Sequence, residues 1–338
     1  MTTVLPPPVP VDAPAQDRRS PATTLDGSDR IFRAVMRGSG ITVLVVMGMV
    51  GMFLLVRGGD ALRKAKWDFI TTQAWEPDAG NFGIAGVLVG TILIALVAIF
   101  FALPLALGTA LYISEYAPRK IQRTLISLVD LMAAVPSVVY GLWGLFFLQK
   151  HVQGLARFIS DYLGWIPFLG VDGVDKDSAL VDRTVYGSSA FIAGMVVALM
   201  ITPIACSVMR EAFMQAPAGE REGAFALGAT KWGMIRSVVL PFGKGGIIGG
   251  MMLALGRALG ETIAVYLIIS IVFTIQPDIL HAGVGQISSL IALRFGEATD
   301  FGLSALMAAG LALFLMTLVI NFVASSVISK SRSGAESD

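Results

Sequence analysis

Two oppositely charged side chains stand inside an otherwise apolar stretch of this sequence. Arg257 and Glu261 lie within residues 247–273, and a spacing of four residues would place both on one face of a helix. A guanidinium is a planar fork that donates two parallel hydrogen bonds to two oxygens of an oxyanion. Two functions stay open for the pair: an ion pair that holds helices together, or an arginine that binds a passing anion while the glutamate orients it.

The composition of the chain places this pair in a membrane. Of 338 residues, 55% are apolar and 14% are charged, whereas a typical soluble domain has about 25% charged residues. Six stretches are apolar enough, over enough residues, to cross a bilayer core about 30 Å thick. They are Ser39–Val56, Ile84–Ile113, Leu125–Leu148, Gly187–Met209, Ile247–Phe273 and Phe301–Ile328. We therefore predict an all-α polytopic membrane protein with about six transmembrane helices, and Arg257 then falls near mid-membrane.

The segments outside the spans predict how the chain is oriented. Residues 1–38 are rich in proline and polar residues, so we expect a disordered tail, with a second short tail at 329–338. Residues 150–186 form an insertion whose acidic residues do not match a calcium loop, so we expect a solvated loop. The side with the termini holds 15 Lys and Arg in its loops, against 9 on the other side. Both termini are therefore expected in the cytoplasm.

Residues 210–246, which we call the elbow, are too long for a simple turn between two spans. Acidic residues near the start predict a helix over Glu220–Leu227, and Gly228 can end it in the left-handed conformation. A second short helix is expected over Thr230–Val239, with the threonine as its N-cap, and Pro241 would stop it. The elbow is thus predicted to be helix, glycine, helix.

Four apolar residues of the elbow are predicted to be its anchors. They are Phe225, Leu227, Trp232 and Ile235. The residues alone leave two possibilities open. The elbow would pack on the membrane surface, or it would present a short helix to a cytoplasmic partner.

The elbow also carries a spaced motif. The run Glu222-Gly223-Ala224-x3-Gly228-x9-Val238-x-Leu240-Pro241 resembles the EAA-loop signature of ABC importer permeases, E-A-A-x3-G-x9-I-x-L-P. Gly223 and Val238 depart from that signature by small substitutions. The resemblance implies a type I ABC importer permease architecture. It also implies that the motif couples the permease to an ATPase, through Glu222, Gly223, Ala224, Gly228, Leu240 and Pro241.

Three more segments narrow this resemblance to the phosphate-specific permeases of the Pst system. They are Asn81–Ile84 with Val89–Thr91, Ala133–Gly144 and Gly256–Val265. The last is more similar to the PstC-type subunit than to its PstA-type partner. The resemblance implies translocation of inorganic phosphate across a bacterial cytoplasmic (inner) membrane, and it implies that Arg257 and Glu261 are needed for transport.

The chain lacks a G-x4-G-K-[ST] phosphate loop, so its energy must come from elsewhere. The resemblance implies three partners: a PstB-type ATPase dimer that uses ATP and Mg, a PstA-type second permease, and a PstS-type extracytoplasmic phosphate-binding protein. On this chain itself no cofactor, metal or catalytic site is expected, because His151 and His281 are remote from each other and Cys206 is the single cysteine. A net charge of +1 gives no indication of nucleic-acid binding.

Two further features of the spans have a structural and a functional interpretation. Pro136 interrupts the third stretch, so Ser137 and Tyr140 could offer hydroxyls to the transport path, although a structural kink is the simpler interpretation. Three small-xxx-small pairs permit close helix packing, including packing against a second permease chain. These pairs are Gly245 with Gly249, Gly246 with Gly250, and Gly256 with Gly260.

Other classes of protein remain as alternatives. A permease for another oxyanion, sulfate or molybdate, would share the elbow. An anion secondary transporter would carry an inverted repeat and an ion-coupling site, and no convincing repeat is present. A membrane enzyme would need a catalytic cluster, which the sequence lacks.

Overall fold

The computed structural model describes residues 27–171 and 185–332. The chain divides after Val50 into an N-terminal unit and a larger unit, Gly51–Asp338. Helix α1 (Gly27–Arg57) begins in the first unit, and none of its residues is buried.

The start of α1 corrects the predicted disordered tail. Residues 27–38 are helical, so the expectation is wrong for them, while residues 1–26 lie outside the described residues. Ile31, Phe32, Val35 and Met36 recur at helical spacing among the arginines of this segment, and they extend the apolar helix toward the N-terminus.

The larger unit opens with short elements. Helices α2 (Gly59–Ala65) and α3 (Asp68–Thr71) precede an antiparallel hairpin of β1 (Trp75–Glu76) and β2 (Asn81–Phe82). Phe82 is buried and lies edge-on to both Trp75 and Phe301, so aromatic packing joins this hairpin to the last helix.

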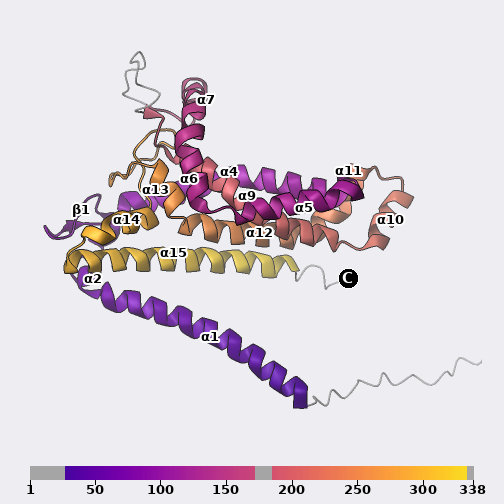
Figure 1. Ribbon diagram of the computed structural model, residues 1–338, viewed down its shortest axis with the longest axis horizontal. Helices are drawn as coiled ribbons and strands as arrows, with labels where there is room; N and C mark the ends of the chain where they lie inside the picture. Colours follow the sequence, from indigo (N-terminus) through magenta and orange to yellow (C-terminus); the bar gives the residue numbers. More distant parts are fainter. Residues whose placement is uncertain (1–26, 172–184, 333–338) are drawn as a thin grey trace, which may run out of the picture. The chain divides into compact units, whose positions relative to one another are not determined.

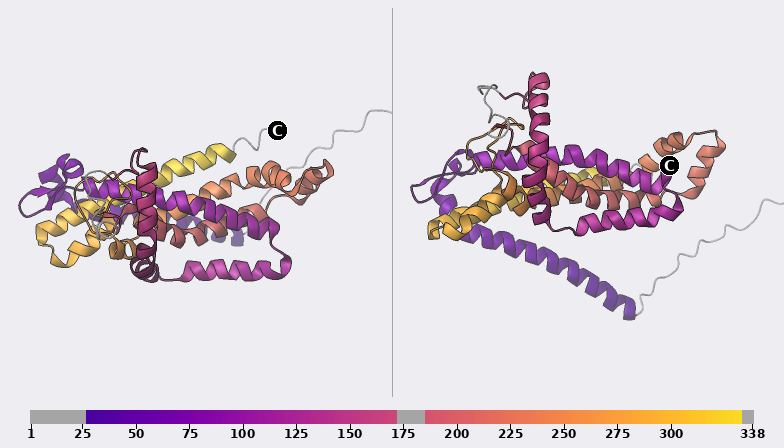
Figure 2. Two further views of the ribbon diagram at one scale, coloured as in Figure 1. Left: turned by 90° about the horizontal axis from the view of Figure 1, so that it is seen from above. Right: turned by 45° about the horizontal axis from the view of Figure 1, so that its top comes forward.

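Four long helices run alongside one another in the larger unit (Figures 1 and 2). They are α4 (Ala85–Leu111), α9 (Ala190–Met214), α12 (Leu240–Gly260) and α15 (Asp300–Arg332). Helix α9 packs against α4 and α12 and supplies many of the buried core residues. A π-helical turn, η1 (Tyr112–Tyr116), continues α4.

The described residues contain five helices that are long and apolar enough to cross a membrane, and a bent pair would make six. The predicted all-helical polytopic fold is therefore confirmed. The bent pair consists of α5 (Arg119–Ala134) and a second arm built from α6 (Ser137–Trp143), the π turn η2 (Gly144–Leu148) and α7 (Gln149–Leu163).

The bend between these arms measures 87°. Val135, which precedes Pro136, is extended, as the proline ring requires. The break expected at Pro136 is thus present. The second arm continues to Leu163, however, so helix occupies the first part of the expected insertion loop at 150–186, and residues 172–184 lie outside the described part of the chain.

The elbow is built from α10 (Ala218–Ala226), α11 (Lys231–Met234) and the π turn η3 (Ile235–Val239), and one continuous helix then runs from Lys231 to Gly260. The expectation that Pro241 stops the second elbow helix is therefore wrong. In η3 the Leu240 amide bonds to Ile235, five residues back. We attribute the tolerance of Pro241 to this wider turn, which displaces the carbonyls that its ring would otherwise meet.

The fifth span also differs from the expected range of 247–273. Helix α12 ends at Gly260, and a separate short helix, α13 (Ile263–Ile268), follows the break. The chain then runs without regular structure to α14 (Ile287–Arg294), the 3-10 turn η4 (Phe295–Glu297) and α15. This irregular segment crosses α4 at Gly86 and Gly90, where an added Cβ would collide with the carbonyls of Phe273 and Gly285.

Candidate transport site and coupling elbow

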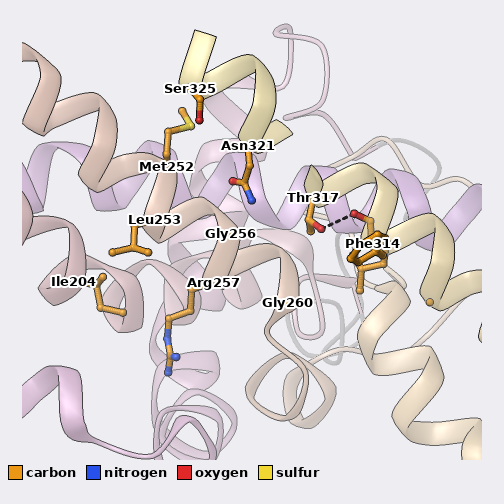
Figure 3. A pocket seen from close by; sticks show the side chains of 12 residues that line it. Ile204, Met252, Leu253, Gly256, Arg257, Gly260, Phe314, Thr317, Asn321 and Ser325 are labelled. Atoms are coloured by element: carbon orange, nitrogen blue, oxygen red, sulfur yellow. Dashed lines mark hydrogen bonds between the residues drawn. The ribbon is translucent and has the colours of Figure 1, made fainter. Parts of the chain in front are cut away.

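A cavity of about 990 Å³ lies between α9, α12 and α15 (Figure 3). Among its described lining residues, Arg257 is the one with a charge, and Thr317, Asn321 and Ser325 are polar. The remaining lining residues are apolar or glycine: Ile204, Met252, Leu253, Gly256, Gly260, Gly310, Leu313 and Phe314. The cavity therefore has apolar walls with a single cation.

Arg257 lies in the last turn of α12, where the helix dipole favours a positive charge. Its side chain is exposed and makes no hydrogen bond or ion pair with another described residue. In Figure 3 the guanidinium points away from Asn321 and Thr317. The helix that carries Arg257 runs from Lys231 to Gly260, so Arg257 lies three residues before the helix ends and not within one that continues to Phe273.

The expectation that Glu261 shares a helix face with Arg257 is also wrong. Glu261 lies past the end of α12 with φ −67° and ψ 130°, which is extended backbone. Its side chain is buried, and Oε1 accepts a hydrogen bond from the Ala264 amide at 3.2 Å. Glu261 therefore caps the start of α13 in this structure and does not form an ion pair with Arg257.

The break between α12 and α13 has its carbonyls satisfied by a serine pair that the sequence analysis missed. Ser288 Oγ donates to the Glu261 carbonyl at 2.7 Å, and Ser289 Oγ donates to the Thr262 carbonyl at 3.2 Å. An interrupted helix is tolerated at membrane depth where other groups satisfy its backbone. Two adjacent serines between Ile287 and Leu290 were the available signal.

Tyr140 and Ser137 occupy the other break. The Tyr140 hydroxyl donates to the Met132 carbonyl at 2.9 Å, and Met132 is the residue whose helical partner would be the missing N–H of Pro136. This supports the structural interpretation of Tyr140. Ser137 is half-buried and has no hydrogen-bond partner among the described residues. A close approach of Gly141 to Ala264 packs α6 on α13, which brings the two breaks together.

The elbow has the predicted helix, glycine, helix form. Gly228 has φ +82°; its amide bonds to the Phe225 carbonyl at 2.9 Å, and the Ala229 amide bonds to the Ala224 carbonyl at 3.0 Å. This is the Schellman arrangement of a helix C-terminus. Thr230 Oγ1 accepts from the Gly233 amide at 3.1 Å, so the predicted N-cap is confirmed.

Most of the predicted apolar anchors of the elbow are exposed on the surface of this chain. Phe225, Leu227 and Trp232 are 47%, 91% and 57% exposed, and of the four predicted anchors only Ile235 is buried. The other three are not buried within the described part of this chain, so anchoring by them on a membrane surface or a partner stays a prediction. The motif residues follow the same division: Glu222, Gly223, Gly228 and Pro241 are exposed, whereas Ala224 and Leu240 are partly buried.

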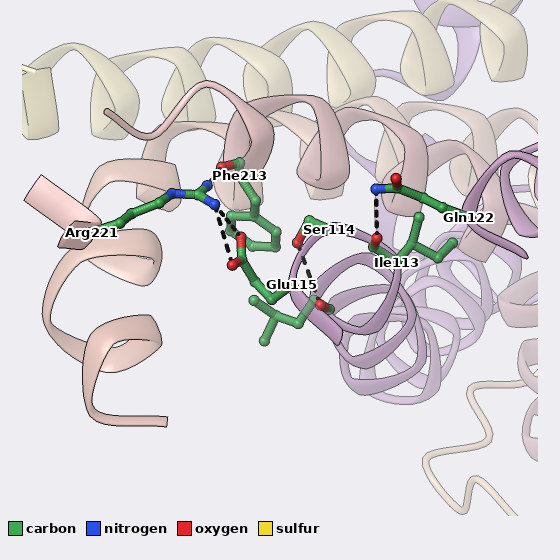
Figure 4. Close-up of polar contacts among 7 residues, drawn as sticks. Ile113, Ser114, Glu115, Gln122, Phe213 and Arg221 are labelled. Atoms are coloured by element: carbon green, nitrogen blue, oxygen red, sulfur yellow. Dashed lines mark hydrogen bonds and ion pairs between the residues drawn. The ribbon is translucent and has the colours of Figure 1, made fainter. Parts of the chain in front are cut away.

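An ion pair that the sequence analysis missed joins the elbow to the end of α4 (Figure 4). Arg221 Nη1 lies 3.1 Å from Glu115 Oε1 and donates to Oε2 at 3.3 Å. Arg221 also donates through Nη2 to the Phe213 carbonyl in α9. The two partners are 106 residues apart in sequence, so no local pattern could have indicated them.

The glycine pairs of α12 fall on different surfaces. Gly246 and Gly250 pack against α9, as the close-packing interpretation predicts. Gly245 and Gly249 line a second cavity, of about 730 Å³, whose wall also includes Arg210. Gly256 and Gly260 line the cavity around Arg257.

Comparison with known proteins decides the family. Residues 102–330 match the family described as "Binding-protein-dependent transport system inner membrane component". The phosphate transport system permease protein PstC 2 of Mycobacterium tuberculosis is 36% identical over 303 residues, which cover 88% of this chain and 91% of that protein. PstC of Mesorhizobium japonicum is 38% identical over 315 residues, 91% of this chain and 93% of that protein. The chain belongs to this family, in its PstC branch. It is thus an inner-membrane transport permease.

Solved structures support the fold of this PstC-type permease. An inward-facing form of the MetNI methionine ABC transporter aligns with a TM-score of 0.50 at 15% identity, over 73% of this chain and 94% of the matched chain. A bacterial ABC transporter that imports alginate aligns with a TM-score of 0.50 at 19% identity, over 89% and 99%. The predicted type I ABC importer permease architecture is confirmed.

Proposed function

We propose that this PstC-type permease is the transmembrane subunit of an ATP-driven importer of inorganic phosphate. The observation that carries the proposal is the match to phosphate transport permeases over about nine-tenths of both chains. The cavity with one unpaired guanidinium supplies chemistry that fits an oxyanion.

In this proposal Arg257 binds phosphate transiently as it crosses the membrane. Its planar fork matches two phosphate oxygens, and no other charged residue lines the described cavity wall to compete for the anion. A single arginine holds the anion weakly enough for release, whereas a cage of cations would retain it.

Glu261, Ser137 and Tyr140 complete the proposed path in supporting positions. Glu261 holds α13 at the end of α12, next to Arg257, through its bond to the Ala264 amide. Tyr140 stabilises the Pro136 break against which α13 packs. Ser137 has a hydroxyl with no described partner, so it is available to the path.

The elbow is the proposed docking surface for a PstB-type ATPase dimer, which binds ATP and Mg. Phe225, Leu227 and Trp232 offer exposed apolar area beside Glu222 on a rigid helix–glycine–helix support. A PstA-type permease beside this chain and a PstS-type phosphate-binding protein on the outer side complete the proposed assembly. The charge bias of the loops supports an arrangement with both termini and the elbow in the cytoplasm.

Transport then proceeds by alternating access. ATP binding closes the ATPase dimer, the elbow transmits the movement to the helix Lys231–Gly260, and the cavity opens outward to receive phosphate. Hydrolysis reverses the movement, and phosphate leaves Arg257 for the cytoplasm.

The test is uptake by the assembled complex in proteoliposomes with the phosphate-binding protein outside and ATP at the ATPase face. We expect labelled phosphate to enter only with hydrolysable ATP and to be unaffected by excess sulfate or molybdate. Uptake that sulfate or molybdate abolishes would instead indicate a permease for that oxyanion. Uptake driven by an ion gradient without ATP would indicate a secondary transporter.

A further inference from the structure

One π turn at the end of α4 contacts both helical arms of the elbow. Glu115 in η1 pairs with Arg221 of α10, with Nη1 to Oε1 at 3.1 Å. The next residue, Tyr116, lies under Lys231 of α11, with Nζ 4.6 Å from the ring centroid. Because α10 and α11 flank the Gly228 turn, η1 holds the elbow from both of its sides.

The Glu115–Arg221 pair is shielded from solvent, unlike an ordinary surface ion pair. The Glu115 side chain is 4% exposed and that of Arg221 is 23% exposed. A second bond from Arg221 reaches the Phe213 carbonyl, so the guanidinium bridges α4, α9 and α10 (Figure 4). Exposed pairs contribute little, but removing one partner of a shielded pair leaves an uncompensated charge.

The turn that makes these contacts is continuous with a long helix. The helix runs from Ala85 to Tyr116, and α4 packs along α9. Gln122 Nε2 of α5 donates to the Ile113 carbonyl at 3.0 Å, so the start of α5 is tied to the same turn. A displacement of the elbow would therefore reach α4 and α5 as well as α12.

We propose that Glu115 and Arg221 are positioning residues for energy coupling, which join the elbow mechanically to α4. The elbow is joined covalently to α9 before α10 and to α12 through η3, and this ion pair adds a non-covalent connection to the helix that α4 begins. Neither residue lines the cavity around Arg257. The inference rests on the proposed function, since the elbow transmits movement only if an ATPase docks on it.

The test uses Glu115→Gln and Arg221→Gln in the full complex. Asp60→Asn and Arg119→Gln are the controls, because both residues are exposed charges outside the elbow. We expect each test variant to assemble and to hydrolyse ATP within about twofold of wild type, while phosphate transported per ATP falls about tenfold, as loss of a shielded partner implies. The double variant should be no worse than Arg221→Gln alone, because that single variant already removes the ion pair. The controls should match wild type.

Hydrogen exchange on the same complexes gives a readout that needs no phosphate. Amides of residues 218–228 should exchange faster in Glu115→Gln, with those of α12 unchanged. An unchanged transport ratio with unchanged exchange would overturn the proposal, and so would loss of assembly, which indicates a purely structural role. A wild-type complex that takes up no phosphate would overturn the proposed function instead, and the exchange comparison would still decide whether the pair tethers the elbow.

Discussion

Two arginines near opposite ends of the helix Lys231–Gly260 have opposite environments: Arg221, in the preceding helix α10, is paired, and Arg257 is not paired within the described part of the chain. At the elbow end, Arg221 is bound by a carboxylate and a backbone carbonyl, and the turn beside it is closed by a glycine and a threonine cap. At the other end, Arg257 has no partner among the described residues. The break beside it is satisfied by Glu261 and two serines.

This difference teaches how a cation can be kept available in a membrane protein. At the Gly260 end, side chains other than Arg257 form the hydrogen bonds that the interrupted backbone needs. The guanidinium of Arg257 therefore has no structural hydrogen bond to make with the described residues. At the elbow, the guanidinium of Arg221 itself forms the bonds that hold α10 against η1 and α9. The same residue type therefore lines a cavity without a described partner at one end and joins neighbouring elements at the other.

The largest expected effect follows from removing the unpaired cation. Arg257→Gln should lower ATP-driven phosphate uptake about a hundredfold, roughly 3 kcal/mol, because a desolvated anion loses its charge-assisted partner. Uptake in proteoliposomes measures it, with Lys244→Gln as a control that removes an exposed charge from the same helix. Uptake at the wild-type rate in an assembled Arg257→Gln complex would remove the distinction between the two ends.

The next effect belongs to the elbow turn. Gly228→Val forces a β-branched residue into φ +82°, at a cost of about 1–2 kcal/mol, so phosphate transported per ATP should fall about tenfold while hydrolysis continues. Open space surrounds Gly228, so crowding does not contribute. Gly219→Ala, in the helical part of α10, is the control and should leave the ratio unchanged.

A smaller effect on uptake distinguishes two possible roles of Glu261, as a hydrogen-bond cap of α13 or as a negative charge. If the residue acts as the cap of α13, Glu261→Gln keeps an acceptor for the Ala264 amide and should lose less than about twofold in uptake, whereas Glu261→Ala should lose about fivefold. The two variants are compared in one uptake assay. Equal and severe losses would show that the negative charge itself is required.

The smallest effect concerns the Pro136 break. Tyr140→Phe removes one hydrogen bond to the Met132 carbonyl, worth about 1 kcal/mol, and should lower the thermal midpoint of the purified complex by roughly 2 °C. Tyr162→Phe is the control, because Tyr162 is exposed on α7. A Tyr140→Phe variant with normal stability but reduced uptake would move this hydroxyl into the transport path.

Short-range chemistry made part of the molecule predictable from sequence. The Gly228 turn, the Thr230 cap and the Pro136 break each depend on residues within one helical turn, and all three are present. The membrane class followed from composition alone.

The features that escaped prediction depend on distant partners. The end of α12 at Gly260 carries no proline, and its carbonyl acceptors are satisfied by serines 27 residues further along. The contact between Glu115 and Arg221 spans 106 residues. Leu227 is exposed because no other part of the described fold packs against it. An apolar residue type alone does not indicate whether such a partner exists.

The π turn η3 determines how α12 is rotated about its axis relative to the elbow. Each residue in an α-helix advances the chain by about 100°, so deleting one residue from Ile235–Val239 would rotate α12 by about that angle against α11. The Gly246–Gly250 surface would then turn away from α9. The nine-residue interval between Gly228 and Val238 therefore determines the angle at which α12 is rotated relative to the elbow. Changes in the length of this interval would be harder to accommodate than changes in its composition.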